Sequence, residues 1–255
     1  MLEGNEASRA KPTVTAPQRT VYRERSPPVA LGWHQRSAQR PPARLLSAFE
    51  TVDKSKQDRG APAPPYAGSG TVSAMTSFPE VRISADRLDI REYGPGDAAR
   101  VEQALGLGGP EGLPPGGPAQ PGEIAGWLAD GVHAPRRAGT GVHLMLLDRA
   151  SDRIVGSISL FHADWETRSA EIGYGVLGDQ RGQGYATEAL AAVSRWALSA
   201  GGVQRAWLTA NTDNVASIRV AEKAGLTREG TLRRAGLEDD GLHDLAVFSL
   251  LDDEA

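Results

Sequence analysis

The sequence predicts an α+β fold in which a mixed sheet carries helices on its faces. The order of the predicted elements leads to this class. Strand-like and helix-like patterns follow one another along the second part of the chain in the order β-α-α-β-β-β-α-β-α-β-β. No stretch approaches the roughly 18 consecutive apolar residues of a membrane-spanning helix. We therefore expect a soluble, cytoplasmic protein with no membrane partner.

The composition divides the chain into two segments. Residues 1–74 contain 11 Arg and Lys, six Asp and Glu and nine of the 17 prolines, whereas residues 75–255 contain 17 basic and 26 acidic residues, a net charge of −9. We expect residues 1–74 to be a disordered Pro/Arg/Ala-rich extension and residues 75–255 to form one domain. The basic residues are scattered, so we expect no nucleic-acid partner. Because the composition changes close to Met75, an alternative is that Met75 is the true start.

The first predicted elements lie between residues 87 and 130. Residues 87–93 alternate like a half-buried strand, which Gly94-Pro95-Gly96 ends, and Asp97 is placed to cap a helix through about residue 105. Residues 106–122 form a long Gly/Pro loop, and loops of this length inside a domain are usually functional or mobile. A short helix follows at about residues 123–130.

Three strands and the clearest helix come next. The strands are predicted at residues 142–147, 154–161 and 170–177, with Asp152 in a tight turn between the first two. Residues 185–200 have the apolar spacing of a helix, which Gly201-Gly202 ends. The remaining elements are a strand at 206–210, a helix from its cap at Asn214 to residue 224, and strands near 227–232 and 242–250.

Two glycine motifs overlap in residues 171–188. Gly173, Gly175 and Gly178 form a literal G-x-G-x-x-G, as in dinucleotide-binding folds. Such folds require the helix to open within the motif and an acidic residue at the end of the next strand. Here residues 179–181 precede the helix, and the next strand ends in Thr-Ala-Asn. The context therefore does not fit dinucleotide binding.

The second motif, residues 181–186 (RGQGYA), lies at the start of the clearest helix. Free backbone N–H groups and the positive end of the helix dipole favour an anion at this place. Gly182 and Gly184 leave room for phosphate oxygens, and Arg181 adds a charged donor. A glycine-rich helix start without a ligand fits the motif equally well. No Gly-Lys-Ser/Thr follows, which excludes a nucleotide-hydrolysing P-loop.

Residues 181–186 resemble the Arg/Gln-x-x-Gly-x-Gly/Ala loop with which the GNAT acetyltransferases bind the pyrophosphate of acyl-CoA. The resemblance covers about residues 82–251, and it implies a GNAT-like, mainly antiparallel sheet with acetyl-CoA as co-substrate. Two later stretches look like further signatures of that superfamily and of its ribosomal-protein alanine N-acetyltransferase branch: residues 211–217 (NTDNVAS) with 221–226 (AEKAGL), and residues 229–233 (EGTLR) with Gly241 and Asp244.

The resemblance also implies how the chain would hold acetyl-CoA. In this family the strand before the loop diverges from its neighbour, which makes a slot for the pantetheine arm. A backbone N–H near Val176 would polarise the thioester carbonyl. Asn214 would hydrogen-bond the arm, although a role as helix N-cap fits it as well. The pyrophosphate would lie on Arg181, Gly182, Gln183, Gly184, Tyr185, Ala186 and Thr187.

The residues that would move protons differ from those of many relatives. The tyrosine that protonates the leaving thiolate falls at Ala221, so Ser217, one turn earlier, is the candidate acid; the alternative is a plain first-turn hydroxyl. Acidic bases of relatives fall at Thr209 and at about Gly236, which cannot serve. Glu171 is the candidate base, acting through water; the alternative is a sheet carboxylate paired with an arginine.

The remaining polar residues give weaker signals. His162 and the turn of residues 164–166 (DWE) would line the acceptor pocket, although a histidine at a strand end is often structural. His133 and His143 lack the spacing of metal ligands, so we expect no metal. The chain has no cysteine, which excludes disulfides and a thiol nucleophile.

Together these features predict an N-acetyltransferase. It would move an acetyl group from the CoA thioester to a primary amine by direct attack in a ternary complex. The acceptor would be a protein N-terminus or a small amine, and the net charge of −9 of residues 75–255 favours a cationic one. The alternative is a catalytically silent CoA-binding or regulatory module, which the missing tyrosine motivates.

Overall fold

The computed structural model describes residues 76–238 and 240–255, so the expectations for residues 1–74 and for Met75 lie outside the described residues. The strands are β1 (Arg82–Ser84), β2 (Leu88–Glu92), β3 (Val142–Asp148), β4 (Arg153–Asp164), β5 (Ser169–Val176), β6 (Arg205–Asn211), β7 (Thr227–Glu238) and β8 (Gly241–Leu251). The α-helices are α1 (Ala98–Gly108), α2 (Ile124–Ala129), α3 (Ala134–Arg137), α4 (Tyr185–Leu198) and α5 (Val215–Lys223).

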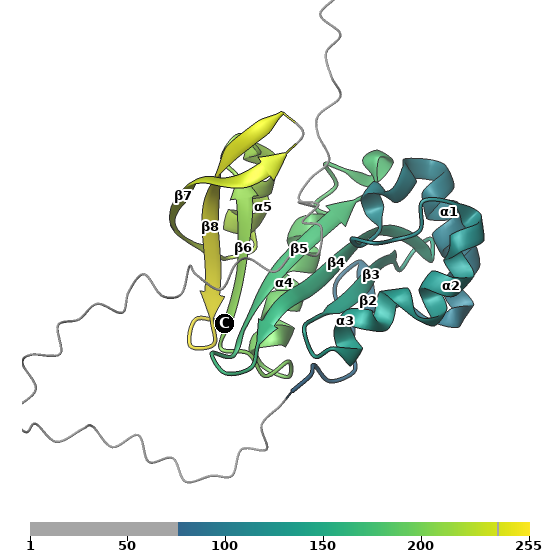
Figure 1. Cartoon of the computed structure of the whole chain (residues 1–255), viewed down its shortest axis with the longest axis horizontal. Coiled ribbons are helices and arrows are strands. Elements are labelled where there is room, and N and C mark those ends of the chain that lie inside the picture. Colours follow the sequence, from purple (N-terminus) through teal and green to yellow (C-terminus); the bar gives the residue numbers. More distant parts are fainter. Residues whose placement is uncertain (1–75, 239) are drawn as a thin grey trace, which may run out of the picture.

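The eight described strands form one sheet in the order β1-β2-β3-β4-β5-β6-β8-β7 (Figure 1). Neighbouring strands are antiparallel except for β5 and β6, which are parallel. A parallel connection needs a crossover, and α4 supplies it between these two strands. The prediction of a mixed, mainly antiparallel sheet with flanking helices is therefore confirmed.

Apolar side chains fill both faces of the sheet. Residues of α4 and α5 belong to one buried cluster, and residues of α1 and α2 belong to a second one. β3 serves both clusters in alternation, because Leu144 and Leu146 belong to the first and Met145 and Leu147 to the second. A strand that is buried on both faces has a continuous apolar run, as residues 144–147 do.

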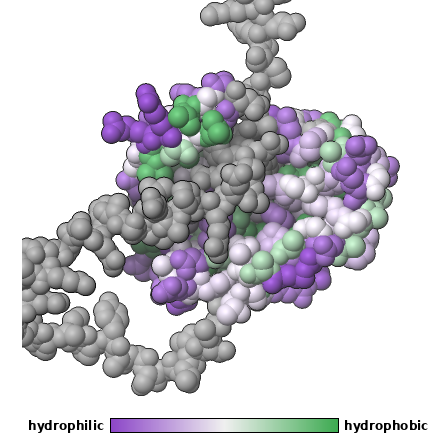
Figure 2. All heavy atoms as spheres, viewed as in Figure 1, coloured by the Kyte–Doolittle hydropathy of each residue, from purple (hydrophilic) through white to green (hydrophobic). Residues whose placement is uncertain are grey.

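The outer strands differ most from the sequence prediction. β1 is a separate strand of three residues paired with β2, too short to show a periodic pattern. β7 extends to Glu238, whereas the sequence predicts an end near residue 232. The sequence contains no signal for the outer part of this strand, because almost all residues of β7 are exposed and neither face selects apolar side chains. Leu232, Leu237 and Leu242 are exposed on the β7–β8 hairpin, where Figure 2 shows apolar side chains beside strongly hydrophilic ones.

The segment between the first helix and β3 is more regular than predicted. α1 continues to Gly108, and two short 3-10 helices, η3 (Gly109–Gly112) and η4 (Pro121–Glu123), lie in the predicted loop of residues 106–122. The helix predicted at 123–130 is α2. None of the helices within residues 76–238 and 240–255 has the length and apolar content needed to cross a bilayer.

The middle of the sheet divides between β5 and β6. Ser169, Ala170 and Glu171 pair with residues of β6, and Glu171 is the last to do so, opposite Trp207. β5 continues to Val176 and β6 to Asn211, and Figure 1 shows the two strands diverging after the paired segment. We call the point at Glu171, where the pairing ends, the split.

Candidate functional site

The predicted anion-binding loop leads directly into α4. Gly182 and Gly184 have left-handed backbones, with φ of 76° and 88°, and Gly184 is the N-cap of the helix. The first helical hydrogen bond runs from the Glu188 N–H to the Gly184 carbonyl. The amides of residues 185–187 therefore precede the helical ladder and are available to a ligand.

The side chains of Arg181 and Gln183 in this loop hydrogen-bond to neighbouring parts of the chain. The Arg181 guanidinium donates to the Val176 carbonyl at 3.2 Å and to the Glu111 carboxylate at 2.9 Å. It thereby ties the loop to the end of β5 and to η3. The Gln183 amide makes only long contacts of 3.4 Å with Asp179 and Gln180. Arg181 is thus a loop-fixing residue that also places positive charge beside the motif.

Arg87, which precedes β2, hydrogen-bonds to the start of α4 and to the loop before it. Its Nε donates to the Glu188 carboxylate at 2.9 Å and its Nη1 donates to the Gln183 carbonyl at 3.0 Å. The guanidinium also lies over the Tyr185 ring, 4.6 Å from the centroid. The Tyr185 hydroxyl donates to Asp148 at 3.1 Å, and burial raises the pKa of this tyrosine. No sequence signal indicates these contacts, because Arg87 and Glu188 are 101 residues apart.

Val176 presents its amide at the open edge of β5. The Leu177 N–H donates to the Val155 carbonyl at 2.9 Å, so residue 177 faces β4. Successive amides of a strand point to opposite edges, so the amides of Val176 and Tyr174 point toward the β6 side. β6 pairs with β5 only as far as Glu171, so these two amides lie beyond the paired segment.

Ser217 and Asn214 meet at the start of α5. The Asn214 Oδ1 accepts from the Ser217 N–H at 3.0 Å, so Asn214 does cap the helix. The buried Ser217 hydroxyl lies 2.9 Å from the hydroxyl of Tyr174, a β5 residue that the sequence analysis did not single out. Burial raises the pKa of Tyr174 to about 12. The Tyr174–Ser217 contact joins β5 to α5 across the diverging strands.

Glu171 stands at the split and contacts a histidine. Its Oε2 lies 2.8 Å from the Nδ1 of His162, and its Oε1 accepts from the Thr209 hydroxyl at 3.4 Å. The Glu171 side chain is 10% exposed and that of His162 is 57% exposed. The arginine partner that the structural alternative supposed for Glu171 is not among its contacts in the described residues.

The turn after His162 is held by local contacts. The Asp164 Oδ1 accepts from the amides of Glu166 and Thr167 at 2.9 and 3.1 Å, and these bonds lower the pKa of Asp164. The Trp165 indole donates to the Gly139 carbonyl at 2.7 Å, and its ring packs on Phe78 at 4.8 Å. Asp164 and Trp165 are therefore occupied in fixing the turn.

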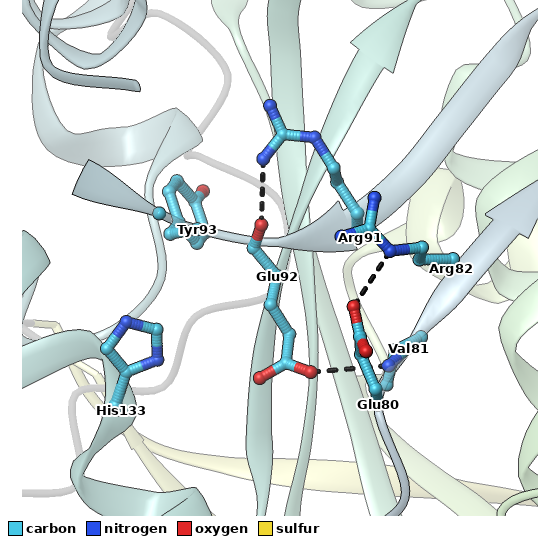
Figure 3. Close-up of a pocket in the computed structure, with 8 residues that line it drawn as sticks. Glu80, Val81, Arg82, Arg91, Glu92, Tyr93 and His133 are labelled. Carbon is cyan, nitrogen blue, oxygen red and sulfur yellow. Dashed lines mark hydrogen bonds and ion pairs between the residues drawn. The ribbon is translucent and has the colours of Figure 1, made fainter. Parts of the chain in front are cut away.

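A pocket of about 370 Å³ lies at the other end of the sheet, beside β1 and β2 (Figure 3). His133 lines it together with Glu92, whose carboxylate the Arg136 guanidinium binds at 2.6 Å. None of the predicted site residues lines this pocket. Its full lining is Glu80, Val81, Arg82, Arg91, Glu92, Tyr93, Gly94 and His133.

His143 and the tip of the β7–β8 hairpin complete the described candidates. His143 lies on β3 with its Nδ1 at 2.7 Å from the Ser159 hydroxyl, and burial lowers its pKa to about 4. Glu238, Asp240 and His243 bring one ligand atom each within 4.8 Å of one another. These three residues are partly or fully exposed, as such groups commonly are without any ion, and we assign no metal to them.

Comparison with known proteins gives a family and several relatives. The profile of the acetyltransferase (GNAT) domain matches residues 87–227, more than half of the chain. The uncharacterized N-acetyltransferase YoaA of Bacillus subtilis (strain 168) is 30% identical over 111 residues, and the ribosomal-protein-serine acetyltransferase of Escherichia coli (strain K12) is 28% identical over 113 residues. Each alignment covers 44% of this chain and 63% of the relative, so the chain spans less than two thirds of the length of these relatives.

Solved structures support the fold. RimL, a ribosomal L7/L12 alpha-N-protein acetyltransferase solved in complex with coenzyme A, has a TM-score of 0.57 and 18% identity, over 69% of this chain and 100% of that chain. The Microcin C7 self-immunity acetyltransferase MccE, in complex with acetyl-CoA and AMP, has a TM-score of 0.56 and 17% identity, over 65% of this chain and 93% of that chain. At these identities the likeness concerns the arrangement of the elements.

Proposed function

The chain belongs to the GNAT acetyltransferase family, and on this basis we propose that it is an acetyl-CoA-dependent N-acetyltransferase acting on a primary amine. The observation that carries the proposal is the set of backbone amides available along β5 and at the start of α4. Beyond the split at Glu171 the chain presents the amides of Tyr174 and Val176 at the open edge of β5, and further along those of residues 185–187, which precede the helical ladder of α4. A pantetheine arm that ends in a pyrophosphate needs hydrogen-bond donors in this arrangement.

The loop residues fit a pyrophosphate. A Cβ added at Gly182 would meet nothing within 4 Å, so the space above this backbone is open. The amides of residues 182–187 would bind the phosphate oxygens, with the helix dipole adding its positive end. Arg181 and Arg87 hold the loop in position through Glu111, Glu188 and the backbone.

The open edge of β5 would take the rest of acetyl-CoA. We assign the amide of Val176, with that of Tyr174 one repeat closer to the split, to the pantetheine arm and the thioester carbonyl. A backbone N–H at this carbonyl stabilises the oxyanion that forms when the amine attacks. Asn214 is assigned to the arm as well, in addition to its role as N-cap.

Two polar groups flank that edge on opposite faces of the sheet. Glu171, at the split, takes the proton of the attacking amine through water. Ser217, whose hydroxyl contacts Tyr174 on the α5 side, donates to the leaving thiolate. Transfer is direct, because binding both substrates in one complex supplies the orientation that the reaction needs.

The acceptor that we propose is the N-terminus of a protein. Relatives such as the ribosomal-protein-serine acetyltransferase and RimL are named for ribosomal proteins, which favours this class over a small amine. The net charge of −9 of residues 75–255 favours a cationic acceptor of either class.

The test measures CoA release and acetyl-CoA binding with the full chain. The parent is given acetyl-CoA with peptides that begin with Ser or Ala, and separately with small primary amines. We expect thiol release with at least one peptide. Acetyl-CoA binding without turnover of any amine would instead support a silent CoA-binding module.

The Gly184→Asp variant tests the loop assignment. A carboxylate against the pyrophosphate should weaken acetyl-CoA binding about 100-fold or more, because juxtaposed like charges cost several kcal/mol. The matched control is Gly178→Ala in the same segment, where an added Cβ meets nothing within 4 Å and φ is not left-handed. Parental affinity in Gly184→Asp, with the fold intact by thermal melting, would refute the assignment.

A further inference from the structure

We infer that His162 is the proton-transfer partner of Glu171, the group through which the proton of the acceptor amine leaves the site. This inference rests on the proposed function. The sequence predicts His162 near the acceptor pocket but indicates no partner for it. In the structure its Nδ1 lies 2.8 Å from the Oε2 of Glu171, the carboxylate at the split.

A local irregularity of β4 brings the imidazole to Glu171. Phe161 pairs with Glu171, and the next pair is Asp164 with Ser169, so the register shifts in between. His162 lies in this bulge with φ of 49°, a conformation that few non-glycine residues adopt. Bulges redirect a side chain, and strained backbones gather at functional sites. Here the bulge turns the ring toward the Glu171 carboxylate.

The order of groups follows from the strand ladder. Because β4 and β5 are antiparallel, His162 lies past Glu171 on the side away from Tyr174 and Val176. Glu171 therefore stands between the imidazole and the edge assigned to acetyl-CoA. It also faces away from α4, since Ile172, Tyr174 and Val176 belong to the cluster on the α4 side and side chains alternate along a strand.

The exposed fractions of the two side chains indicate the direction in which the proton leaves. The Glu171 side chain is 10% exposed and that of His162 is 57% exposed, so the carboxylate is enclosed and the imidazole reaches water. Among the described residues, Thr209 is the other side chain that hydrogen-bonds Glu171, at the longer distance of 3.4 Å. An imidazole can take a proton at one ring nitrogen and release one from the other.

The proton balance closes with these groups. A primary ammonium gives one proton, through water, to the Glu171 carboxylate. Its neutral nitrogen then forms the C–N bond while the C–S bond breaks. The Ser217 hydroxyl gives its proton to the CoA thiolate, and the second proton of the nitrogen restores that hydroxyl. The first proton passes from the Glu171 carboxyl to Nδ1 of His162, and the imidazolium releases a proton to bulk water. The Oε2–Nδ1 hydrogen bond serves both stages, since either atom acts as donor depending on where the proton is.

His162→Ala tests the inference by chemical rescue. We expect kcat to fall about 10-fold or more, in line with the loss of a general acid–base group, while the Kd for acetyl-CoA stays at the parental value. Added imidazole should restore much of kcat, because the site of His162 is open to solvent. His133→Ala, in the pocket of Figure 3, is the matched control and should neither lose activity nor respond to imidazole.

His162→Gln separates proton transfer from positioning. Glutamine keeps an N–H for Glu171 but cannot take up a proton, so we expect it to be as slow as His162→Ala before rescue. Parental kcat in either variant, or a loss in His162→Ala that imidazole does not restore, would overturn the inference. If the parent itself binds acetyl-CoA but turns over no amine, the proposed function fails and this inference falls with it.

Discussion

β5 is paired differently along its two edges. Toward β4 the ladder runs from Asp164–Ser169 to Gly156–Val176, almost the whole length of the strand. Toward β6 it ends at Glu171. The same strand is thus fixed to the sheet on one side and presents free amides on the other.

The comparison shows how a rigid sheet can offer its own backbone to a ligand. An isolated strand with unpaired amides is poorly ordered, because its chain entropy is not offset. In β5 the β4 edge supplies the order, and so the amides of Tyr174 and Val176 are held in fixed positions before any ligand binds. Such preorganised donors are the kind that stabilise a developing negative charge most.

Removing a backbone amide should impair catalysis at the open edge of β5 and lower stability at the edge paired with β4. Val176→Pro removes the amide that points to the open edge and breaks no bond to β4, so we expect the fold to persist while kcat/KM falls about 100-fold, as for the loss of one oxyanion donor. Leu177→Pro removes the bond from the Leu177 N–H to the Val155 carbonyl, so we expect lower thermal stability instead. Equal effects of the two substitutions on melting would contradict the division into a paired and an open edge.

The paired edge should not tolerate even a methyl group at Gly156. A Cβ built there would lie 2.2 Å from the Gly175 carbonyl oxygen and 3.0 Å from the Val176 Cα, both backbone atoms. We expect Gly156→Ala to lower the free energy of unfolding by about 1–3 kcal/mol, as for overpacked cores. Gly230→Ala in β7, where nothing lies within 4 Å, is the control for chemical denaturation. A stable Gly156→Ala variant would show that β4 and β5 can move apart.

His143 on β3 should make the stability of the fold depend on pH. Burial lowers the pKa of His143 to about 4, so between pH 6.5 and 4 the unfolded chain binds a proton that the folded chain does not. Stability therefore falls as the pH drops through this window, by less than about 1 kcal/mol from this group at pH 6. We expect the difference in unfolding free energy between the parent and His143→Gln to change over this pH range. A difference that is constant with pH would contradict the neutral state of His143 in the folded chain.

Much of the fold could be predicted because it depends on local patterns. The buried face of α4, the cap at Asn214 and the tight turn at Asp152 all follow from spacing and residue type. β1 and the outer half of β7 could not be predicted, because short or fully exposed strands carry no periodic signal.

The candidate site was predictable only in part, for the same reason. The loop of residues 181–186 shows itself as a glycine-rich helix start. The contacts of Arg87 with Glu188 and of Tyr174 with Ser217 join residues 101 and 43 positions apart, which no spacing rule connects. The bulge at His162 also left no sequence signal, since a histidine with positive φ looks like any other strand residue.

The ion pairs of the two arginines that contact the loop affect how the site responds to salt. Arg181 and Arg87 are each bound to a carboxylate, Glu111 and Glu188, so much of their charge is already neutralised. The attraction for a pyrophosphate then comes mainly from aligned backbone dipoles at close range. Ionic screening acts over about 8 Å at physiological ionic strength and weakens such contacts little. On the proposed function, acetyl-CoA binding at this loop should therefore be nearly indifferent to changes in ionic strength.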